Sequence, residues 1–270
     1  LQFSASNLFT VTAYNGSGTS GTASPPSSVS QTVSDINTAG NGYDWSHGTH
    51  CAGLVGATTN NNIGVASIGH GVTLMGVRTA ADNGDLLYTY VGAQWAAENG
   101  ANVISMSYGG TQYSAALDQI HQDMKDNYGC ILIAAAGNDG ITEVNYPGGY
   151  DCVIAVAMSD YDDQLNYSPA GGGYPESGSN YGSWVSIAAP GGQDGTMFSQ
   201  GGIGLFSTTY NYNFFEENYV GGYANVTGHY DLMSGTSMAT PLSAGVVGLM
   251  LSIDPSLTQE DVLNCLQSTA

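Results

Sequence analysis

The sequence has almost no basic side chains. Its 270 residues include only two, Arg78 and Lys125, against 22 acidic ones, which gives a formal net charge of −20 at pH 7. Because so few cations cannot neutralise a phosphate backbone, the composition excludes nucleic acid as a partner. A strongly acidic surface repels itself and suits a soluble protein in secreted or saline conditions.

Long apolar runs and closely paired cysteines are also missing. No segment contains eighteen uninterrupted apolar residues, so we expect no membrane span. The first residues lack the basic and apolar regions of a signal peptide, and we expect any such peptide to lie upstream or to have been removed. The cysteines include no Cys-x-x-Cys pair, which argues against a zinc site. They are Cys51, Cys130, Cys152 and Cys265.

Short apolar segments alternate with helical ones along most of the chain. Fully apolar strands that alternate with helices indicate a parallel sheet covered on both faces, so we predict an α/β fold. Such folds place their sites at the carboxyl ends of the strands. The strands are predicted in residues 72–78, 102–110, 130–140, 152–157 and 184–191, and the helices in 88–99, from Ser114 and from Thr258.

Residues 232–245 hold a glycine turn, a serine and a proline that lead directly into an apolar run. This layout places Ser237 where a loop becomes a buried helix. Free backbone N–H groups and the positive end of the helix dipole stabilise negative charge at such a point. Ser237 is therefore a candidate nucleophile, and the alternative is a serine that merely caps the helix.

Four motifs, in order along the chain, resemble those of subtilisin-like serine proteases. They are His-Gly-Thr-His-Cys-Ala-Gly from His47, Ala-Ala-Gly-Asn ending at Asn138, the segment from Ser179 to Ala-Ala-Pro-Gly, and Gly-Thr-Ser-Met-Ala around Ser237. The resemblance covers most of residues 44–266. It implies a three-layer α/β/α fold and a serine endopeptidase. Ser237 would be the nucleophile, His47 the general base, and Asn138 an oxyanion donor together with the Ser237 backbone N–H.

The resemblance also implies a cleft for protein or peptide substrates. One wall would pair with an extended peptide through backbone hydrogen bonds, and it consists of Ser107, Tyr108 and Gly109. The opposite wall of the primary specificity pocket consists of Ala135, Ala136 and Gly137. Because these residues are small, we expect an open pocket that accepts an apolar or aromatic residue before the scissile bond. A protease of this kind is expected outside the cell.

An Asn-rich loop resembles part of a calcium site of the same family. Asn61 would provide its side-chain oxygen, and Ile63 and Val65 would provide backbone carbonyls, which are ligands that suit a hard cation. Calcium would be structural, since the chemistry itself requires no cofactor. A plain turn of asparagine and glycine is the alternative.

Residues 1–33 differ from the rest of the chain. A short alternating segment, 8–14, precedes a turn and a Ser/Pro-rich stretch, and together they resemble the last strands of a fibronectin type III module. We interpret residues 1–33 as the tail of a neighbouring or inserted domain, or as a substitute for normal protease sequence. The peptidase domain is then assigned to residues 34–270, which end before the family's last strand and helix.

The orienting aspartate of the family cannot be identified. Asn15 stands 47 − 15 = 32 residues before His47, about the family's usual separation, but the fibronectin-like interpretation accounts for Asn15 better. We expect the aspartate to lie upstream of Leu1 or to have been lost. A catalytically impaired subtilisin fold that binds peptides or partners is therefore the alternative function.

The cysteines and one long segment complete the predictions. Cys130 and Cys152 begin sequential strands that should be neighbours, which favours a disulfide between them. Cys51 is expected to be a small buried residue and Cys265 a core position of a helix. Residues 192–231, rich in glycine, tyrosine and asparagine, are interpreted as an inserted surface hairpin or loop.

Overall fold

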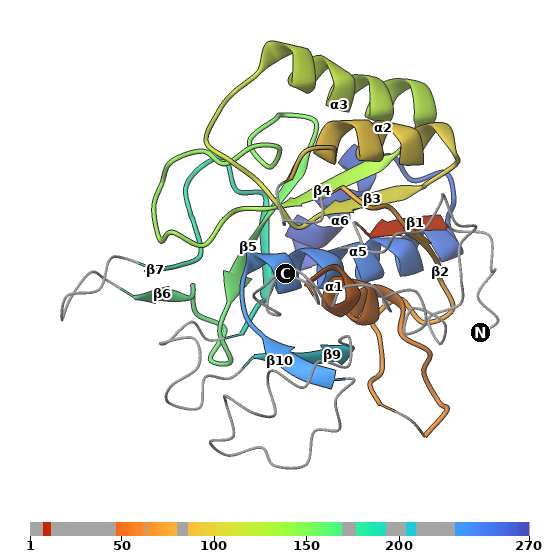
Figure 1. Ribbon diagram of the computed structural model, residues 1–270, viewed down its shortest axis with the longest axis vertical. Coiled ribbons are helices and arrows are strands. Elements are labelled where there is room, and N and C mark those ends of the chain that lie inside the picture. The colour runs from red at the N-terminus through yellow and green to blue at the C-terminus, as the bar shows by residue number, and fades with distance from the viewer. Residues whose placement is uncertain are drawn as a thin grey trace.

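The computed structural model describes residues 8–11, 47–62, 64–79, 86–168, 177–192, 204–208 and 230–269. At its centre is a six-stranded sheet with the order β2-β1-β3-β4-β5-β8 (Figure 1). Every neighbouring pair in this sheet is parallel. The strands are β1 Leu8–Val11, β2 Thr73–Gly76, β3 Val103–Met106, β4 Ile131–Ala135, β5 Ile154–Ser159 and β8 Ile187–Pro190.

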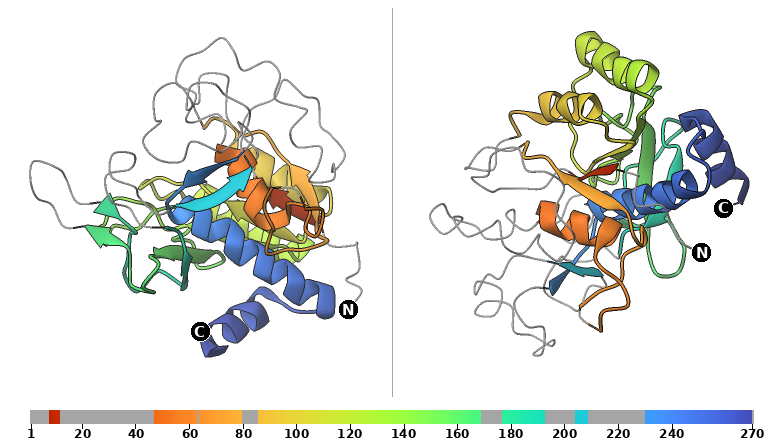
Figure 2. Two further views of the ribbon diagram at one scale, coloured as in Figure 1. Left: turned by 90° about the horizontal axis from the view of Figure 1, so that it is seen from below. Right: turned by 90° about the vertical axis from the view of Figure 1, so that its right-hand side faces the viewer.

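Helices cover both faces of the sheet, which gives three layers (Figures 1 and 2). On one face lie α2 Thr89–Glu98 and α3 Ala115–Tyr128, and on the other lie α1 His47–Gly56, α5 Thr236–Ile253 and α6 Gln259–Thr269. Alternate strand residues point to opposite faces. Ile104 and Leu132 accordingly pack with α2 and α3, whereas Val103 and Ile133 pack with α1 and α5. The predicted α/β fold is confirmed.

Helix α5 forms the centre of one layer. Its length and apolar composition would suffice to cross a membrane, the only such helix among the described residues, but 61% of that window is buried inside the molecule. A helix that is apolar on all sides and packed against a sheet is a core helix. Its buried positions include Met238, Ala239, Val247 and Leu251.

Strand β1 lies inside the sheet. Its four residues pair in parallel with β2 on one side and with β3 on the other, so they belong to the sheet of the peptidase segment. This placement fits the second interpretation of residues 1–33, a substitute for normal protease sequence, whereas the boundary at residue 33 stays a prediction. The likeness of this stretch to a fibronectin module otherwise concerns residues outside the described ranges and stays a prediction.

The segment predicted to be an insertion contributes two described strands. β9, Leu205–Thr208, pairs antiparallel with β10, Tyr230–Met233. Residues 193–203 and 209–229 lie outside the described residues. A second small antiparallel pair joins β6, Tyr167–Ser168, to β7, Ser177–Gly178.

Two predictions about cysteine are wrong. Cys130 and Cys152 are free thiols, and the Cys130 thiol donates to the Ala101 carbonyl at 3.0 Å. Cys265 is exposed, since it lies on the outer face of α6, whereas Val262 of the same helix is fully buried.

Candidate active site

A sharp turn places Ser237 at the start of α5. The backbone of Gly235 has φ 142°, a conformation that residues with a Cβ rarely adopt, and its N–H donates to the Gly191 carbonyl at 2.8 Å. The Gly235 carbonyl in turn accepts from the backbone N–H groups of Met238 and Ala239. The helix begins at Thr236, so half-buried Ser237 lies in its first turn, as predicted.

Pro241 frees the carbonyl of Ser237 for contacts with other elements. Position 241 should supply the N–H that bonds to the Ser237 carbonyl four residues earlier, but proline has no N–H. Two side chains donate instead: the Ser107 hydroxyl at 2.9 Å, from the end of β3, and the Cys51 thiol at 3.3 Å, from α1. The first turn of α5 is thereby joined to both elements.

Helix α1 carries His47 at its first position, where the ring is half-buried. Strand β9 holds this helix, because the Ser207 hydroxyl donates to the His50 carbonyl and the Thr208 hydroxyl donates to the Thr49 carbonyl, each at 2.8 Å. His47 and Ser237 thus begin two helices that pack on each other.

Cys51 lies between these two helix starts. Its sulfur is 4.0 Å from Nδ1 of His47 and 3.3 Å from the Ser237 carbonyl oxygen. Burial raises the pKa of Cys51 to about 12, so the thiol stays protonated and acts as a donor at neutral pH. The prediction that Cys51 is a small buried residue is confirmed.

Asn138 follows β4 and its side chain has a fixed orientation. The side-chain oxygen accepts from the Thr236 N–H at 2.8 Å and from the Thr236 hydroxyl at 3.0 Å. Since the oxygen is occupied by Thr236, the amide nitrogen of the exposed residue Asn138 supplies the two N–H donors, and it lies 3.6 Å from a Cβ built at Gly235, beside the first turn of α5. A donor fixed at this place can bind an oxyanion that forms at Ser237.

The two predicted walls of the cleft flank the start of α5. In the first wall, the Ser107 hydroxyl donates to the Ser237 carbonyl. In the second wall, the Gly137 N–H donates to the Thr236 hydroxyl at 3.1 Å. Asn180 supports the second wall, because its amide donates to the Ala136 carbonyl and accepts from the Asp139 N–H. The predicted residues are therefore brought together from strands β3 and β4.

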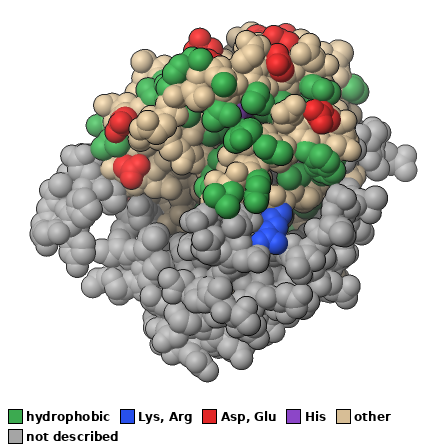
Figure 3. Space-filling view, turned by 45° about the horizontal axis from the view of Figure 1, so that its top comes forward, with side chains coloured by type: hydrophobic (Ala, Val, Ile, Leu, Met, Phe, Trp, Pro, Cys, Tyr) green, Lys and Arg blue, Asp and Glu red, His purple; other side chains and the backbone are tan. Residues whose placement is uncertain are grey.

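A cavity of about 220 Å³ opens beside the first wall, next to Tyr108 and Gly109. Apolar side chains gather on this face of the molecule, over the helices α2 and α3 (Figure 3). The lining includes His121, which is buried; its Nδ1 donates to the Leu117 carbonyl at 2.6 Å, and its Nε2 has no hydrogen bond. Burial lowers the pKa of His121, so the neutral ring is favoured.

The structure describes two of the three predicted calcium ligands, Asn61 and Val65. Asn61 is exposed and Val65 is half-buried, whereas Ile63 lies outside the described residues. Within the described ranges, no three His, Cys, Asp or Glu side chains gather as a metal site. The loop therefore offers neutral oxygens alone, a weak donor set for a divalent cation.

The aspartate that would orient His47 is expected upstream of Leu1 or to have been lost, and before His47 the structure describes only Leu8–Val11. Parallel strands end at the same edge of a sheet, and β1 is parallel to β3, which leads to Ser107. The chain after β1 reads Thr-Ala-Tyr-Asn15, and its first acidic residue is Asp35. Asn15 itself lies outside the described residues, and its relation to His47 stays a prediction.

Comparison with known proteins identifies the family of the chain. The model of the subtilase family matches residues 15–270. Thermitase from Thermoactinomyces vulgaris is 38% identical over 208 residues, which are 76% of this chain and 61% of thermitase. A halolysin-like extracellular serine protease from Natrialba magadii is 34% identical over 226 residues, 83% of this chain and 35% of that protein.

A solved structure of a protease from Pseudoalteromonas arctica superposes with a TM-score of 0.65 at 31% identity, covering 83% of this chain and 63% of that one. The fold has three α/β/α layers, and His47 and Ser237 lie at the starts of two helices that pack on each other. This arrangement defines the class of protein to which the chain belongs. The chain belongs to the subtilase family. It spans less than two thirds of the length of each of these three relatives.

Proposed function

We propose that the chain is a serine endopeptidase that hydrolyses peptide bonds through an acyl-enzyme on Ser237. The observation that carries the proposal is the arrangement at the start of α5. Cys51 contacts both His47 and Ser237, and the side-chain oxygen of Asn138 is fixed by Thr236, the first residue of α5. Attack by a serine needs a nucleophile, a base and an oxyanion donor in one place.

In the proposed reaction, the Ser237 hydroxyl attacks the scissile carbonyl while His47 takes its proton. The carbonyl oxygen becomes an oxyanion that accepts from Asn138 and from the Ser237 backbone N–H. When the intermediate collapses, His47 gives the proton to the leaving amine and an ester on Ser237 remains. Water, deprotonated by His47, then hydrolyses the ester and restores the serine.

The substrate is proposed to be an extended peptide that pairs with Ser107, Tyr108 and Gly109. Backbone pairing of this kind recognises the main chain and leaves selection to pockets for alternate side chains. The extracellular relatives and the acidic composition support a secreted enzyme. The reaction uses groups of the chain alone, and calcium at the loop of Asn61 would only stabilise the fold.

Digestion of a defined peptide mixture tests the proposal. We expect the wild-type chain to release new amino termini that mass spectrometry locates at internal peptide bonds, and we expect Ser237→Ala to release none above background. Ser243→Ala is the matched control, because this buried serine of the same helix donates only to the Ala239 carbonyl. Equal cleavage by the wild type and by Ser237→Ala would contradict the proposal.

A further inference from the structure

Asn180 binds the backbone on both sides of Asn138, the proposed oxyanion donor. Its backbone N–H donates to the Gly137 carbonyl at 2.9 Å, in the peptide unit before Asn138. Its side-chain oxygen accepts from the Asp139 N–H at 2.9 Å, in the peptide unit after Asn138. Because the two planar peptide units that flank a residue determine where its Cα lies, Asn180 fixes the backbone position of Asn138.

The Asn180 side chain is enclosed by the segment that it binds. It is 2% exposed, its amide nitrogen donates to the Ala136 carbonyl at 3.0 Å, and its oxygen also accepts from the Ile141 N–H at 3.3 Å. A Cβ built at Gly137 would overlap the same amide nitrogen, so the amide packs directly against this backbone. Any effect of the Asn180 side chain on a substrate therefore passes through residues 136–141.

The chain around Asn180 is itself anchored to the central sheet. The preceding residue, Ser179, is fully buried, and its hydroxyl accepts from the Met158 N–H in β5 at 2.9 Å. One residue earlier, the Gly178 N–H donates to the Asn138 carbonyl at 3.2 Å. The backbone of Asn138 is thus held by a segment that is connected to a neighbouring strand.

We propose that Asn180 is a positioning residue of the oxyanion site, which holds the Asn138 amide where negative charge develops on the scissile carbonyl. The inference rests on the proposed endopeptidase function. Thr236 fixes the side-chain oxygen of Asn138, and Asn180 fixes its backbone, so the amide nitrogen is directed from both ends. A donor stabilises the transition state most when it does not have to move as the charge forms.

Steady-state kinetics of Asn180→Ala on a fluorogenic peptide test the inference. We expect kcat to fall by about 10-fold or more with KM nearly unchanged, because the misplaced amide would lose an interaction that forms only in the transition state. A peptide aldehyde, whose adduct with Ser237 resembles the transition state, should bind more weakly by a similar factor. In an Asn138→Ala background, the same change is expected to lower kcat by less than about 2-fold, since no donor remains to be positioned.

Gln259→Leu is the matched control for a general loss of stability. This buried amide also bonds to β4, where its oxygen accepts from the Leu132 N–H near the start of the strand. We expect the control to lower Tm while kcat stays within about 2-fold of the wild type, because its contacts do not include Asn138.

Asn180→Asp provides a second variant if the alanine variant does not fold. Aspartate keeps an oxygen that accepts from the Asp139 N–H, but it loses the donor to the Ala136 carbonyl. We expect a kcat below that of the wild type, and we expect this loss also to disappear in the Asn138→Ala background.

The outcomes distinguish the inference from the function on which it rests. An unchanged kcat in folded Asn180→Ala, or a loss that is equal with and without Asn138, would overturn the inference while leaving the peptidase function intact. A raised KM with an unchanged kcat would do the same, because it would assign Asn180 to substrate binding. If the wild type does not cleave the fluorogenic peptide and the mixed-peptide digest is also negative, both the proposed function and the inference are wrong.

Discussion

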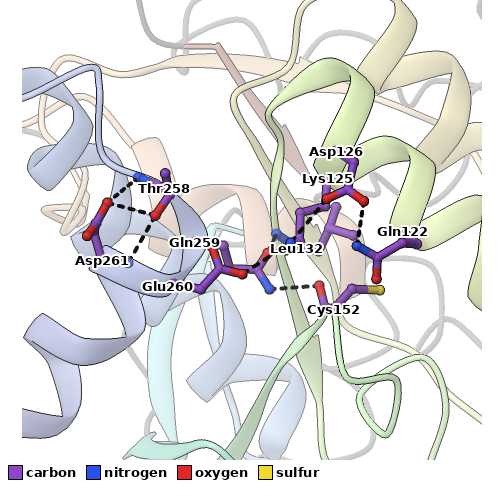
Figure 4. Close-up of polar contacts among 9 residues, drawn as sticks. All are labelled: Gln122, Lys125, Asp126, Leu132, Cys152, Thr258, Gln259, Glu260 and Asp261. Atoms are coloured by element: carbon purple, nitrogen blue, oxygen red, sulfur yellow. Dashed lines mark hydrogen bonds and ion pairs between the residues drawn. The ribbon is translucent and has the colours of Figure 1, made fainter.

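Replacing Gln259 with leucine tests how the last helix is attached to the sheet. Gln259 is 7% exposed at the start of α6, and both ends of its side-chain amide bond to the backbone of the sheet (Figure 4). Its oxygen accepts from the Leu132 N–H in β4 at 2.9 Å, and its nitrogen donates to the Cys152 carbonyl, just before β5, at 2.7 Å. The amide thus connects β4 to the segment that leads into β5.

The size of the effect follows from the two backbone groups that would lose their partner. A buried polar group without a hydrogen bond costs about 1–3 kcal/mol, so two such groups cost about 2–6 kcal/mol. The apolar surface of a buried leucine offsets about 1–2 kcal/mol of this. We therefore expect Gln259→Leu to lower the free energy of unfolding by about 1–4 kcal/mol.

Urea unfolding in a Ser237→Ala background, where self-cleavage is excluded, provides the measurement. The matched control is Gln267→Leu in the same helix, because Gln267 is exposed and makes a single bond to the Ser186 carbonyl. We expect the control to change the free energy of unfolding by about 0.5–1 kcal/mol at most. Equal effects of the two variants would refute the argument that the buried amide bridge fixes α6.

Four other predictions concern single residues. Asn138→Ala is expected to lower kcat by about 10²–10³, a magnitude known for subtilisin itself, with KM nearly unchanged in steady-state assays. Asn15→Asp is expected to raise kcat by up to about 10⁴, the size of the tautomer effect in chymotrypsin-type enzymes, whereas the control Asn37→Asp should have no effect. Native protein should react with iodoacetamide at Cys265 only, and at all four cysteines after denaturation, as mass spectrometry can count.

The fourth is a pH dependence. Burial lowers the pKa of His121 below its usual 6.5, although the Leu117 carbonyl and the Asp118 carboxylate oppose the shift. Because the unfolded chain then binds the proton more readily, stability is fully present above about pH 6.5 and is lost as the pH falls toward the lowered pKa. His121→Phe should flatten the fall of Tm between about pH 7 and pH 5, and an unchanged slope would contradict this cause.

The central sheet and the residues at its edge could be predicted from the sequence because their signals are local. Apolar segments such as 102–106 and 130–136 are typical of buried strands, and the turn before Ser237 predicts a helix start. The role of Asn138 came from the resemblance of Ala-Ala-Gly-Asn to the family motif and stays a prediction. The structure brings these residues together through long-range contacts, such as the bond between Ser107 and Ser237, that no local pattern encodes.

The wrong or incomplete predictions concern relations between distant segments. The alternation in residues 8–14 suggested a half-buried strand of another module, but β1 is paired on both sides. The strands that follow Cys130 and Cys152 are neighbours as predicted, but the contact of the Cys130 thiol with the Ala101 carbonyl depends on side-chain packing that no local pattern encodes. Asn145 lies in an irregular segment, and no local pattern predicted that its amide would approach Ala135 and Gly109.

Labelling with a fluorophosphonate probe tests the central claim, that Ser237 is an activated nucleophile. The probe forms a covalent bond only with a serine whose hydroxyl is deprotonated by a neighbouring base as it attacks. We predict one label per wild-type chain, located at Ser237 by peptide mapping, with none in Ser237→Ala and much slower labelling in His47→Ala. A folded wild-type chain that takes up no label, or takes it up equally in Ser237→Ala, would contradict the account.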